Sequence, residues 1–368
     1  MKEDCQRKLA GAYEGRRVWL TGDTGFKGSW LAFWLHGLGA EVLGIGLEPE
    51  TEDGPFVRGD LASLIRHETA DIRDRERMAA LAREFRPDAV FHLAAQALVR
   101  RSYTEPVETV DTNVRGTAHV LEAVRQAGNP CAVVVVTSDK CYENREEDYA
   151  YREDDPMGGH DPYSASKGCQ ELVAASYRAA FFAPGGRIQL ATARAGNVIG
   201  PGDWAADRIV PDAVRALRGG QPLRVRNPKA VRPWQHVLEP LGGYLRLGQA
   251  LMEEGAAAAE AWNFGPDPAS ARTVGDLADR FCRAWGDGAA WQAEADPANP
   301  HEAHLLQLSI GKAAARLDWH PRWDFDTTVR RTAEGYRAML AARDAAAVRE
   351  FMAAELAAYE AGAGKDAP

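Results

Sequence analysis

The sequence predicts an α/β fold of the Rossmann type: a doubly wound parallel sheet followed by a smaller C-terminal α/β domain that binds substrate. Short apolar runs alternate with helical patterns over residues 1–199, which is typical of βαβ units and a parallel sheet. The first apolar run ends in a glycine-rich turn that opens a helix. After Gly200 the periodicity weakens and Arg, Pro and Gly become frequent, which indicates a second domain.

The expected strands are short and apolar along their whole length. Helices cover both faces of a doubly wound sheet, so its strands need not alternate between apolar and polar residues. Right-handed crossovers then place consecutive strands beside one another. The expected strands are residues 16–21, 41–47, 89–93, 132–136, 188–193 and 262–265.

The expected helices have apolar residues three and four positions apart. We predict a first domain over 1–199, joined again by 233–266, and a second domain over 200–232 and 267–360. Residues 361–368 are expected to be a disordered tail. The expected helices are residues 29–38, 75–85, 107–127, 163–182, 241–252 and 274–285, with a further helical run near the C-terminus.

Composition excludes several classes of protein. The formal net charge of -9 over 368 residues argues against a nucleic-acid-binding surface. No segment approaches the ~20 apolar residues of a membrane helix, and the N-terminus has no secretory signal, so we expect a cytoplasmic protein. The cysteines are scattered without metal-ligand spacing, which predicts free thiols and no metal site. They are Cys5, Cys131, Cys141, Cys169 and Cys282.

The glycine-rich turn is a candidate site for a dinucleotide. Gly22, Gly25 and Gly28 follow the pattern GxxGxxG, with Phe26 and Lys27 between the last two. Such glycines let the backbone approach a pyrophosphate at a helix N-terminus. A plain turn is the alternative, but the position between a strand and a helix favours the cofactor.

Two acidic positions extend this candidate site. Glu48 ends the second expected strand, 20 residues after Gly28. A carboxylate there binds the ribose 2′-hydroxyl and repels a 2′-phosphate, which favours NAD over NADP; the alternative is a solvated side chain. Asp71 and Ile72 follow a further presumed strand, which lies between the expected strands 41–47 and 89–93, and an Asp there could reach the adenine amino group.

The segment DPYSASK provides the strongest catalytic signal. Asp161 can cap a helix that has Pro162 at its first position. Tyr163 and Lys167 then lie on one helix face, four residues apart. A neighbouring ammonium favours the charged phenolate, so we predict that the pKa of Tyr163 lies near neutral and that this residue accepts a proton from a sugar hydroxyl.

A polar segment follows the apolar strand AVVVV. Open α/β sheets bind ligands at the carboxyl ends of their strands, and Ser138, Asp139 and Lys140 lie at such an end. Ser138 could hydrogen-bond the same hydroxyl as Tyr163. Asp139 and Lys140 are two further ionisable groups that a plain dehydrogenase does not need; the alternative is a solvated turn.

Taken together, these motifs make the chain resemble the extended short-chain dehydrogenases/reductases. Within them it resembles the nucleotide-sugar 4,6-dehydratases, and among these the branch that acts on CDP-glucose. The glycine and Tyr/Lys motifs are typical of the superfamily, whereas TSDKCYEN and RPWQHVLEP are typical of the branch. The matching stretches are TGDTGFKGSWL (21–31), HLAAQALVRRSY (92–103), TSDKCYEN (137–144), DPYSASK (161–167), ARAGNVIGPGDW (193–204) and RPWQHVLEPL (232–241).

The resemblance implies further site residues. Ala94 and Ala95 would line the cofactor groove, and Asn197, Arg208 and Arg232 would bind the sugar diphosphate; the arginines could instead be only solvated. It also implies a homodimer formed through helices near 107–127 and 163–182. Relatives acting on dTDP-glucose have Asp-Glu where this chain has Asp-Lys, which leaves the second base open.

The implied reaction converts CDP-glucose to CDP-4-keto-6-deoxyglucose and water with retained NAD, a step in deoxysugar biosynthesis for lipopolysaccharide or O-antigen. Tyr163 would remove the C4 hydroxyl proton, Asp139 would protonate the departing C6 hydroxyl, and Lys140 would either take the C5 proton as a neutral amine or stabilise the enolate as a cation. Alternatives are another nucleotide-sugar 4,6-dehydratase, a 4-epimerase, which needs no such Asp-Lys pair, and a non-catalytic dinucleotide-binding regulator.

Overall fold

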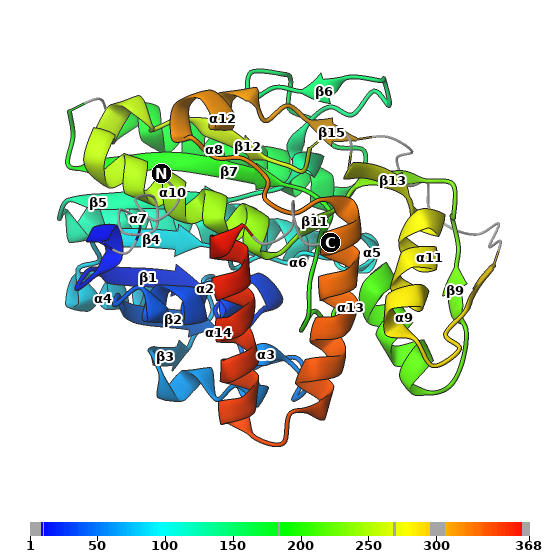
Figure 1. Cartoon of the computed structure of the whole chain (residues 1–368). Coiled ribbons are helices and arrows are strands. Elements are labelled where there is room, and N and C mark those ends of the chain that lie inside the picture. Colours follow the sequence, from blue (N-terminus) through cyan, green and yellow to red (C-terminus); the bar gives the residue numbers. More distant parts are fainter. Residues whose placement is uncertain (1–8, 10, 183–184, 268–269, 295–305, 363–368) are drawn as a thin grey trace.

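Seven parallel strands form the central sheet of the computed structural model, which describes residues 9, 11–182, 185–267, 270–294 and 306–362. The strand order is β12-β7-β5-β4-β1-β2-β3 (Figure 1). Every neighbouring pair is parallel, as the sequence predicts. The strands are β1 (Arg17–Thr21), β2 (Glu41–Gly46), β3 (Arg66–Thr69), β4 (Ala89–His92), β5 (Cys131–Val136), β7 (Ile188–Ala195) and β12 (Ala261–Phe264).

The strand order reverses between β1 and β4. From β1 the chain first moves outward through β2 and β3, then returns to place β4 on the other side of β1. The loops that follow β1 and β4 therefore run in opposite directions, and a crevice opens where they part. In open α/β sheets this switch point is where ligands bind.

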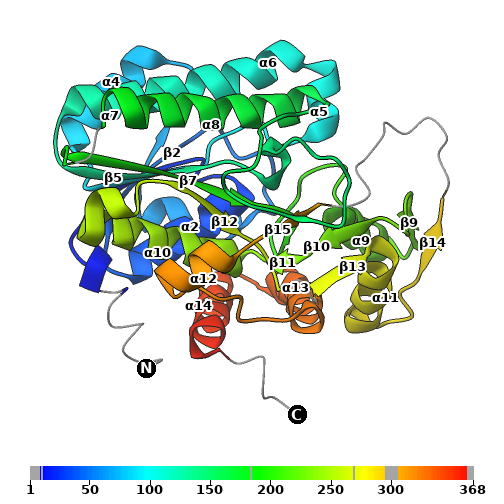
Figure 2. The same cartoon turned by 90° about the horizontal axis from the view of Figure 1, so that it is seen from above.

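Helices cover both faces of the sheet, as Figure 2 shows. On one face lie α4 (Arg75–Phe85), α7 (Thr117–Ala127) and α8 (Pro162–Ala180), which share a buried cluster with the sheet. On the other lie α2 (Phe26–Gly37) and α10 (Leu238–Glu254). The expected single helix over 107–127 is divided into α6 (Pro106–Val110), the π-helical segment η2 (Asp111–Gly116) and α7.

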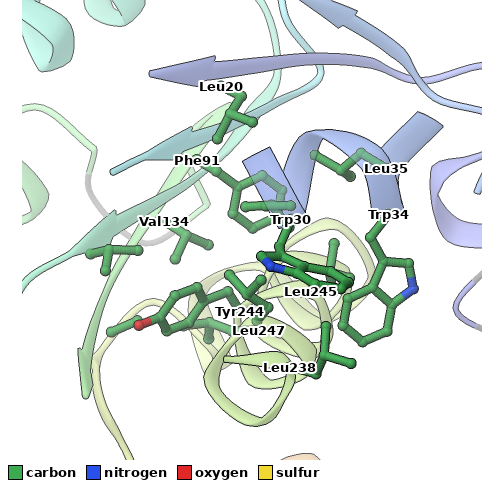
Figure 3. Close-up of a cluster of buried hydrophobic side chains, with 14 of the residues drawn as sticks. Leu20, Trp30, Trp34, Leu35, Phe91, Val134, Leu238, Tyr244, Leu245 and Leu247 are labelled. Carbon is green, nitrogen blue, oxygen red and sulfur yellow. The ribbon is translucent and has the colours of Figure 1, made fainter. Parts of the chain in front are cut away.

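Large apolar side chains join α2 and α10 to the sheet. Figure 3 shows how the two helices meet beneath the strands. Trp30 and Leu245 are fully buried, and fully burying an aliphatic or aromatic side chain of this size stabilises the fold by about 1.5–3 kcal/mol. The labelled members of this cluster are Leu20, Trp30, Trp34, Leu35, Phe91, Val134, Leu238, Tyr244, Leu245 and Leu247.

The remaining C-terminal elements build a smaller unit over the carboxyl ends of the strands. Its own buried cluster joins α9 (Ile209–Arg218), α11 (Val274–Trp285) and α13 (Phe325–Ala341). Short strand pairs complete it: β10 (Val231–Pro233) with β13 (Ala271–Thr273), and β9 (Leu223–Val225) with β14 (Trp291–Ala293).

The last helix of the structure returns to the sheet. α14 (Ala345–Ala361) packs on α2, where Phe351 meets Trp30 and Tyr359 meets Trp34, each edge to face.

Most of the expected tail, 363–368, lies outside the described residues. None of the helices described is both long enough and apolar enough to cross a membrane. Smaller elements are α3 (Pro55–Arg58), α5 (Val99–Thr104), η3 (Asp139–Cys141), β6 (Ala150–Tyr151), β8 (Val198–Ile199), β11 (Gln235–His236), β15 (Gln307–Leu308) and α12 (Gly311–Leu317).

Candidate functional site

A cavity of about 900 Å³ lies at the carboxyl ends of the strands, between the sheet and the smaller C-terminal unit. It contains every residue that the sequence singles out as a candidate for cofactor, substrate or catalysis. They are Gly22, Gly25, Phe26, Lys27, Gly28, Glu48, Asp71, Ile72, Ala94, Ala95, Ser138, Asp139, Lys140, Tyr163, Lys167, Asn197, Arg208 and Arg232.

The glycine loop has the shape that a pyrophosphate requires. Gly22 has φ +81°, and a Cβ there would lie 2.8 Å from the backbone nitrogen of Ala94. A Cβ on Gly28 would lie 1.8 Å from the carbonyl oxygen of Gly22. Helix α2 begins directly after Gly25, so its first N–H groups face the cavity without a capping side chain. Such an N-terminus binds anions, and the loop therefore fits a dinucleotide.

The two acidic candidates, Glu48 and Asp71, differ in the partners that their carboxylates already have. The carboxylate of Glu48 is exposed and accepts one hydrogen bond, from Thr69 Oγ1 at 3.1 Å. Asp71 is bound by Arg73, whose Nη2 lies 2.6 Å from Asp71 Oδ2. Burial acts to raise the pKa of Asp71, but the hydrogen bonds and charge of Arg73 outweigh it and the pKa is lowered. Glu48 is thus the freer acceptor for a ribose hydroxyl.

Helix α8 presents the Tyr/Lys pair as the sequence predicts. Asp161 caps the helix by accepting the backbone N–H of Ser164 at 2.9 Å, and Pro162 is the first helical residue. Tyr163 and Lys167 are both buried, and the Lys167 ammonium lies 5.9 Å from the centre of the Tyr163 ring.

The predicted pKa of Tyr163 is wrong for the protein without ligand. Burial is the dominant effect and raises this pKa to about 12, while a hydrogen bond with Ser138 and the charge of Arg208 act to lower it. Burial also lowers the pKa of Lys167 to about 7, and the nearby charge of Lys27 adds to this effect. The prediction of a lowered Tyr163 pKa considered only the charge of Lys167, and it omitted the effect of burial on both groups.

A buried chain of polar side chains that sequence analysis missed holds Lys167 in place. Lys167 Nζ donates to Gln170 Oε1 at 3.0 Å, and Gln170 Nε2 donates to Thr117 Oγ1 at 2.8 Å. Thr117 in turn lies 2.9 Å from His92 Nε2, and His92 Nδ1 lies 2.7 Å from Thr21 Oγ1. Gln170 lies three residues after Lys167 on α8, but Thr117, His92 and Thr21 come from α7, β4 and β1, so no motif spacing could reveal those three.

Asp139 and Lys140 stand at the end of β5, in the short helix η3. Ser138 Oγ donates to Asp139 Oδ1 at 3.0 Å. Asp139 is only 2% exposed, and its Oδ2 has no hydrogen-bond partner among the described residues. A Cβ on Gly196 would lie 1.8 Å from that oxygen, so the backbone of the β7 loop closes over the carboxylate. Lys140 is half-buried beside it.

The three residues assigned to the diphosphate all lie in the chain that follows β7. Arg208 Nη1 pairs with Asp203 Oδ2 at 3.0 Å, and the charge of Asp203 raises the pKa of the guanidinium. Arg232 lies on β10 and donates to the carbonyl of Val231. Asn197 has φ +40°, a conformation that Asn tolerates better than most residues. Asp203, which orients Arg208, was not found from sequence.

The described part of the chain contains no group of three or more His, Cys, Asp or Glu side chains arranged to hold a metal ion. Its cysteines, Cys131, Cys141, Cys169 and Cys282, are free thiols. The ionisable groups that line the cavity include the Tyr/Lys pair, the Asp-Lys pair, Lys27, Glu48, Asp71, Asp203 and several arginines.

Comparison with known proteins places this site in a family. The family model described as GDP-mannose 4,6 dehydratase matches residues 20–332. The chain is 50% identical over 336 residues to a CDP-glucose 4,6-dehydratase of Salmonella typhimurium, covering 90% of this chain and 93% of that relative. It is 31% identical to a dTDP-glucose 4,6-dehydratase of Streptomyces antibioticus, covering 80% of this chain and 79% of that one.

Solved structures show the same fold. The dTDP-glucose 4,6-dehydratase of Streptomyces venezuelae, solved with NAD bound, aligns with a TM-score of 0.74 at 26% identity, covering 87% of this chain and 97% of that chain. A UDP-glucose 4-epimerase of Stenotrophomonas maltophila aligns with a TM-score of 0.77 at 24% identity, covering 88% of this chain and 99% of that chain, and supports the fold alone. The chain belongs to the GDP-mannose 4,6-dehydratase family of extended short-chain dehydrogenases/reductases.

Proposed function

We propose that this protein is an NAD-dependent CDP-glucose 4,6-dehydratase, which converts CDP-glucose to CDP-4-keto-6-deoxyglucose and water. The observation on which this rests is that a Tyr/Lys oxidation pair and a separate Asp-Lys pair line one cavity beside a glycine loop. Identity of 50% over 90% of the chain to a CDP-glucose 4,6-dehydratase supports the same reaction and the same nucleotide.

The oxidation step uses the α8 pair and Ser138. The glycine loop of Gly22, Gly25 and Gly28 would hold NAD, which would supply the hydride acceptor for C4 of the sugar and the hydride donor for C6, and whose positive ring would favour the Tyr163 phenolate. Tyr163 accepts the C4 hydroxyl proton, and Ser138 hydrogen-bonds the same oxygen. Lys167 stays in place through Gln170 and keeps the phenolate paired with a cation.

The elimination step uses Asp139 and Lys140. The C4 ketone acidifies the C5 proton, which Lys140 accepts as a neutral amine. Asp139 donates a proton to the C6 hydroxyl, so the C6–O bond breaks, water leaves and a C5–C6 double bond forms. In the second version of this scheme Lys140 stays charged and stabilises the enolate oxygen, while water or Asp139 moves the protons. The burial of Asp139 under Gly196 supports its role as the acid, because that carboxyl group is kept from bulk water.

A nucleotide-sugar 4-epimerase is the alternative within this fold, and a solved epimerase indeed aligns over 88% of the chain. An epimerase shares the Tyr/Lys pair but has no use for an acid at C6. The Asp-Lys pair at Asp139 and Lys140 therefore favours the dehydratase. A regulator that only binds a dinucleotide would need neither pair.

Turnover of a panel of nucleotide-linked glucoses, with mass analysis of each product, tests this proposal. We expect CDP-glucose to lose one water and to react faster than dTDP-, UDP- or GDP-glucose. A product of unchanged mass would indicate an epimerase, and unchanged sugar would indicate a binding protein. Preference for another base would place the chain in a sister branch.

We also propose a homodimer that buries the outer surface of α6 and α8. Large apolar side chains lie exposed there: Val107 is 75% exposed, Leu172 61% and Val110 47%. A cluster of this kind marks an interaction site on a soluble surface. Val107→Asp should yield monomers in sedimentation, because it places a charge on the most exposed apolar side chain of this surface; an unchanged sedimentation coefficient would contradict this surface. The domain boundaries and the cytoplasmic location stay predictions.

A further inference from the structure

A network of buried polar side chains lies behind the cavity, at the end of β5. Its ion pair joins α8 to β7: Glu171 Oε2 lies 2.9 Å from Arg194 Nη2, and both side chains are buried. Glu171 also accepts hydrogen bonds from Thr137 and Thr192. Arg194 Nη1 donates to the hydroxyl of Tyr142 at 2.6 Å. Of these five residues only Thr137 lines the cavity, so the network supports the site from behind.

The two charges of this network are costly to bury. Their attraction returns only part of the free energy lost on leaving water, and well-packed apolar side chains could fill the same space without that loss. What a satisfied buried network does provide is one fixed arrangement of the elements that it joins. This one joins α8, the helix of the Tyr/Lys pair, to the chain directly after η3, the turn that carries the Asp-Lys pair.

Tyr142 is the member of the network nearest to that turn, and both its hydroxyl and its ring are held. The hydroxyl accepts from Arg194 and donates to Asn263 Oδ1 on β12 at 2.8 Å. The ring stacks on that of Tyr151, with centroids 5.2 Å apart, and the Arg194 guanidinium lies 4.9 Å from its centre. Tyr142 is only 1% exposed. It is therefore a fixed point two residues after Lys140.

The place of Lys140 depends on such a fixed point more than that of Asp139 does. The Asp139 carboxylate accepts from Ser138 and lies under Gly196. The Lys140 ammonium, by contrast, has no hydrogen-bond or ion-pair partner in the part of the chain that the structure describes. Its backbone N–H donates to Ser138 Oγ at 3.2 Å. The path of the backbone therefore places the Lys140 side chain, with Ser138 holding that path on one side and Tyr142 on the other.

We propose that Tyr142 is a positioning residue for the elimination step: held between Arg194 and Asn263, it sets the place of Lys140 relative to the sugar. This role rests on the function proposed above, and it is the same whether Lys140 takes the C5 proton or stabilises the enolate. Tyr142 exchanges no proton with the substrate and acts through the backbone of the turn. Oxidation by the Tyr/Lys pair does not need it, because that pair is carried by α8.

Single-turnover kinetics on Tyr142→Phe test the proposal, with CDP-glucose and NAD both saturating. The change removes only the hydroxyl, so Arg194 keeps its bonds to Glu171 and to the carbonyl of Glu153. Formation of the reduced nicotinamide reports oxidation, and mass analysis reports loss of water. We expect oxidation at the parent rate and elimination slowed by roughly 5- to 100-fold, because a shift of about 1 Å can cost about 100-fold in a catalytic step. The keto-glucose intermediate should accumulate.

Tyr151→Phe is the matched control. Tyr151 is buried and stacks on Tyr142, but its hydroxyl accepts from the backbone N–H of Arg145 at 2.8 Å. Its loss should leave both rates unchanged. A double-mutant cycle then shows whether Tyr142 acts through Lys140. In the Lys140→Met background, Tyr142→Phe should slow the residual elimination by a smaller factor than it does in the parent.

A role of Tyr142 in stability alone would reduce the amount of active protein and slow both steps equally. Equal slowing of both steps, equal slowing of elimination by Tyr151→Phe, or the same factor with and without Lys140 would each overturn the proposal. Urea unfolding checks that each variant is folded; an unfolded Tyr142→Phe protein would assign the hydroxyl to the fold and also overturn it. If the parent protein itself releases no water from CDP-glucose, the proposed function fails and the role of Tyr142 falls with it.

Discussion

Replacing Lys167 of α8 should make the protein more stable. Lys167 is only 3% exposed, and burial, with the charge of Lys27 beside it, lowers its pKa from 10.5 to about 7. At about 1.4 kcal/mol per pH unit, a protonated Lys167 destabilises the cofactor-free fold by at most roughly 5 kcal/mol. Lys167→Met removes that charge but leaves the Gln170 acceptor unpaired, which costs about 1–3 kcal/mol. We expect a net gain of roughly 2–4 kcal/mol near pH 6.

The pH dependence of this gain identifies its cause. Between pH 7 and 10.5 the unfolded parent binds more protons at residue 167 than the folded parent, so the stability of the parent rises with pH in that window. The Met variant has no titrating group at residue 167, so its stability lacks this rise with pH. Its advantage is therefore greatest below pH 7 and should shrink by about 2–3 kcal/mol between about pH 6 and pH 9.

Urea unfolding of the cofactor-free parent and variant at these two pH values measures the effect. Lys229→Met is the matched control, since Lys229 is exposed and its loss should change stability little at either pH. A Met variant less stable than the parent at pH 6, or an advantage that does not change with pH, would refute the reasoning.

Three further predictions concern the reaction. Tyr163→Phe should slow sugar oxidation by about 10²–10⁴-fold with cofactor affinity nearly intact; near-normal turnover would remove Tyr163 from the chemistry. NAD should bind better than NADP. In direct titrations Glu48→Gln should reduce the ratio of NAD affinity to NADP affinity by roughly tenfold, because the charge that repels the 2′-phosphate is lost. Equal affinities for NAD and NADP in the parent would contradict this role of Glu48. Asp139→Asn and Lys140→Met should both still reduce bound NAD and then stall before water leaves. Failure to form the reduced cofactor would move that residue to the oxidation step.

Much of the fold could be predicted because local patterns determine it. Apolar runs in the sequence coincide with β1, β2, β4, β5, β7 and β12, and the cap at Asp161 marks the start of α8. The π-helical segment η2 could not be predicted, because its turn accommodates contacts made only in the folded chain. Within it, Asn113 Nδ2 donates to Ser166 Oγ on α8 at 2.8 Å.

The candidate site was predictable where motifs are local and not where groups from distant elements meet. Ser138, Tyr163 and Lys167 were found from the sequence, and the structure brings them to one cavity. The pKa of Tyr163 was predicted in the wrong direction, since burial depends on the whole fold. The direction of the Lys27 side chain was likewise invisible: its spacing assigned it to the cofactor, but its ammonium meets Tyr244 of α10.

Transfer of deuterium within one sugar tests the central claim most directly. The two pairs of ionisable groups around one cavity imply that the hydride removed from C4 returns to C6 of the same molecule. CDP-glucose deuterated at C4 should therefore give CDP-4-keto-6-deoxyglucose with deuterium at C6 and one water fewer, while NAD is regenerated. Accumulation of reduced cofactor in step with product, or loss of the deuterium from the sugar, would contradict the account.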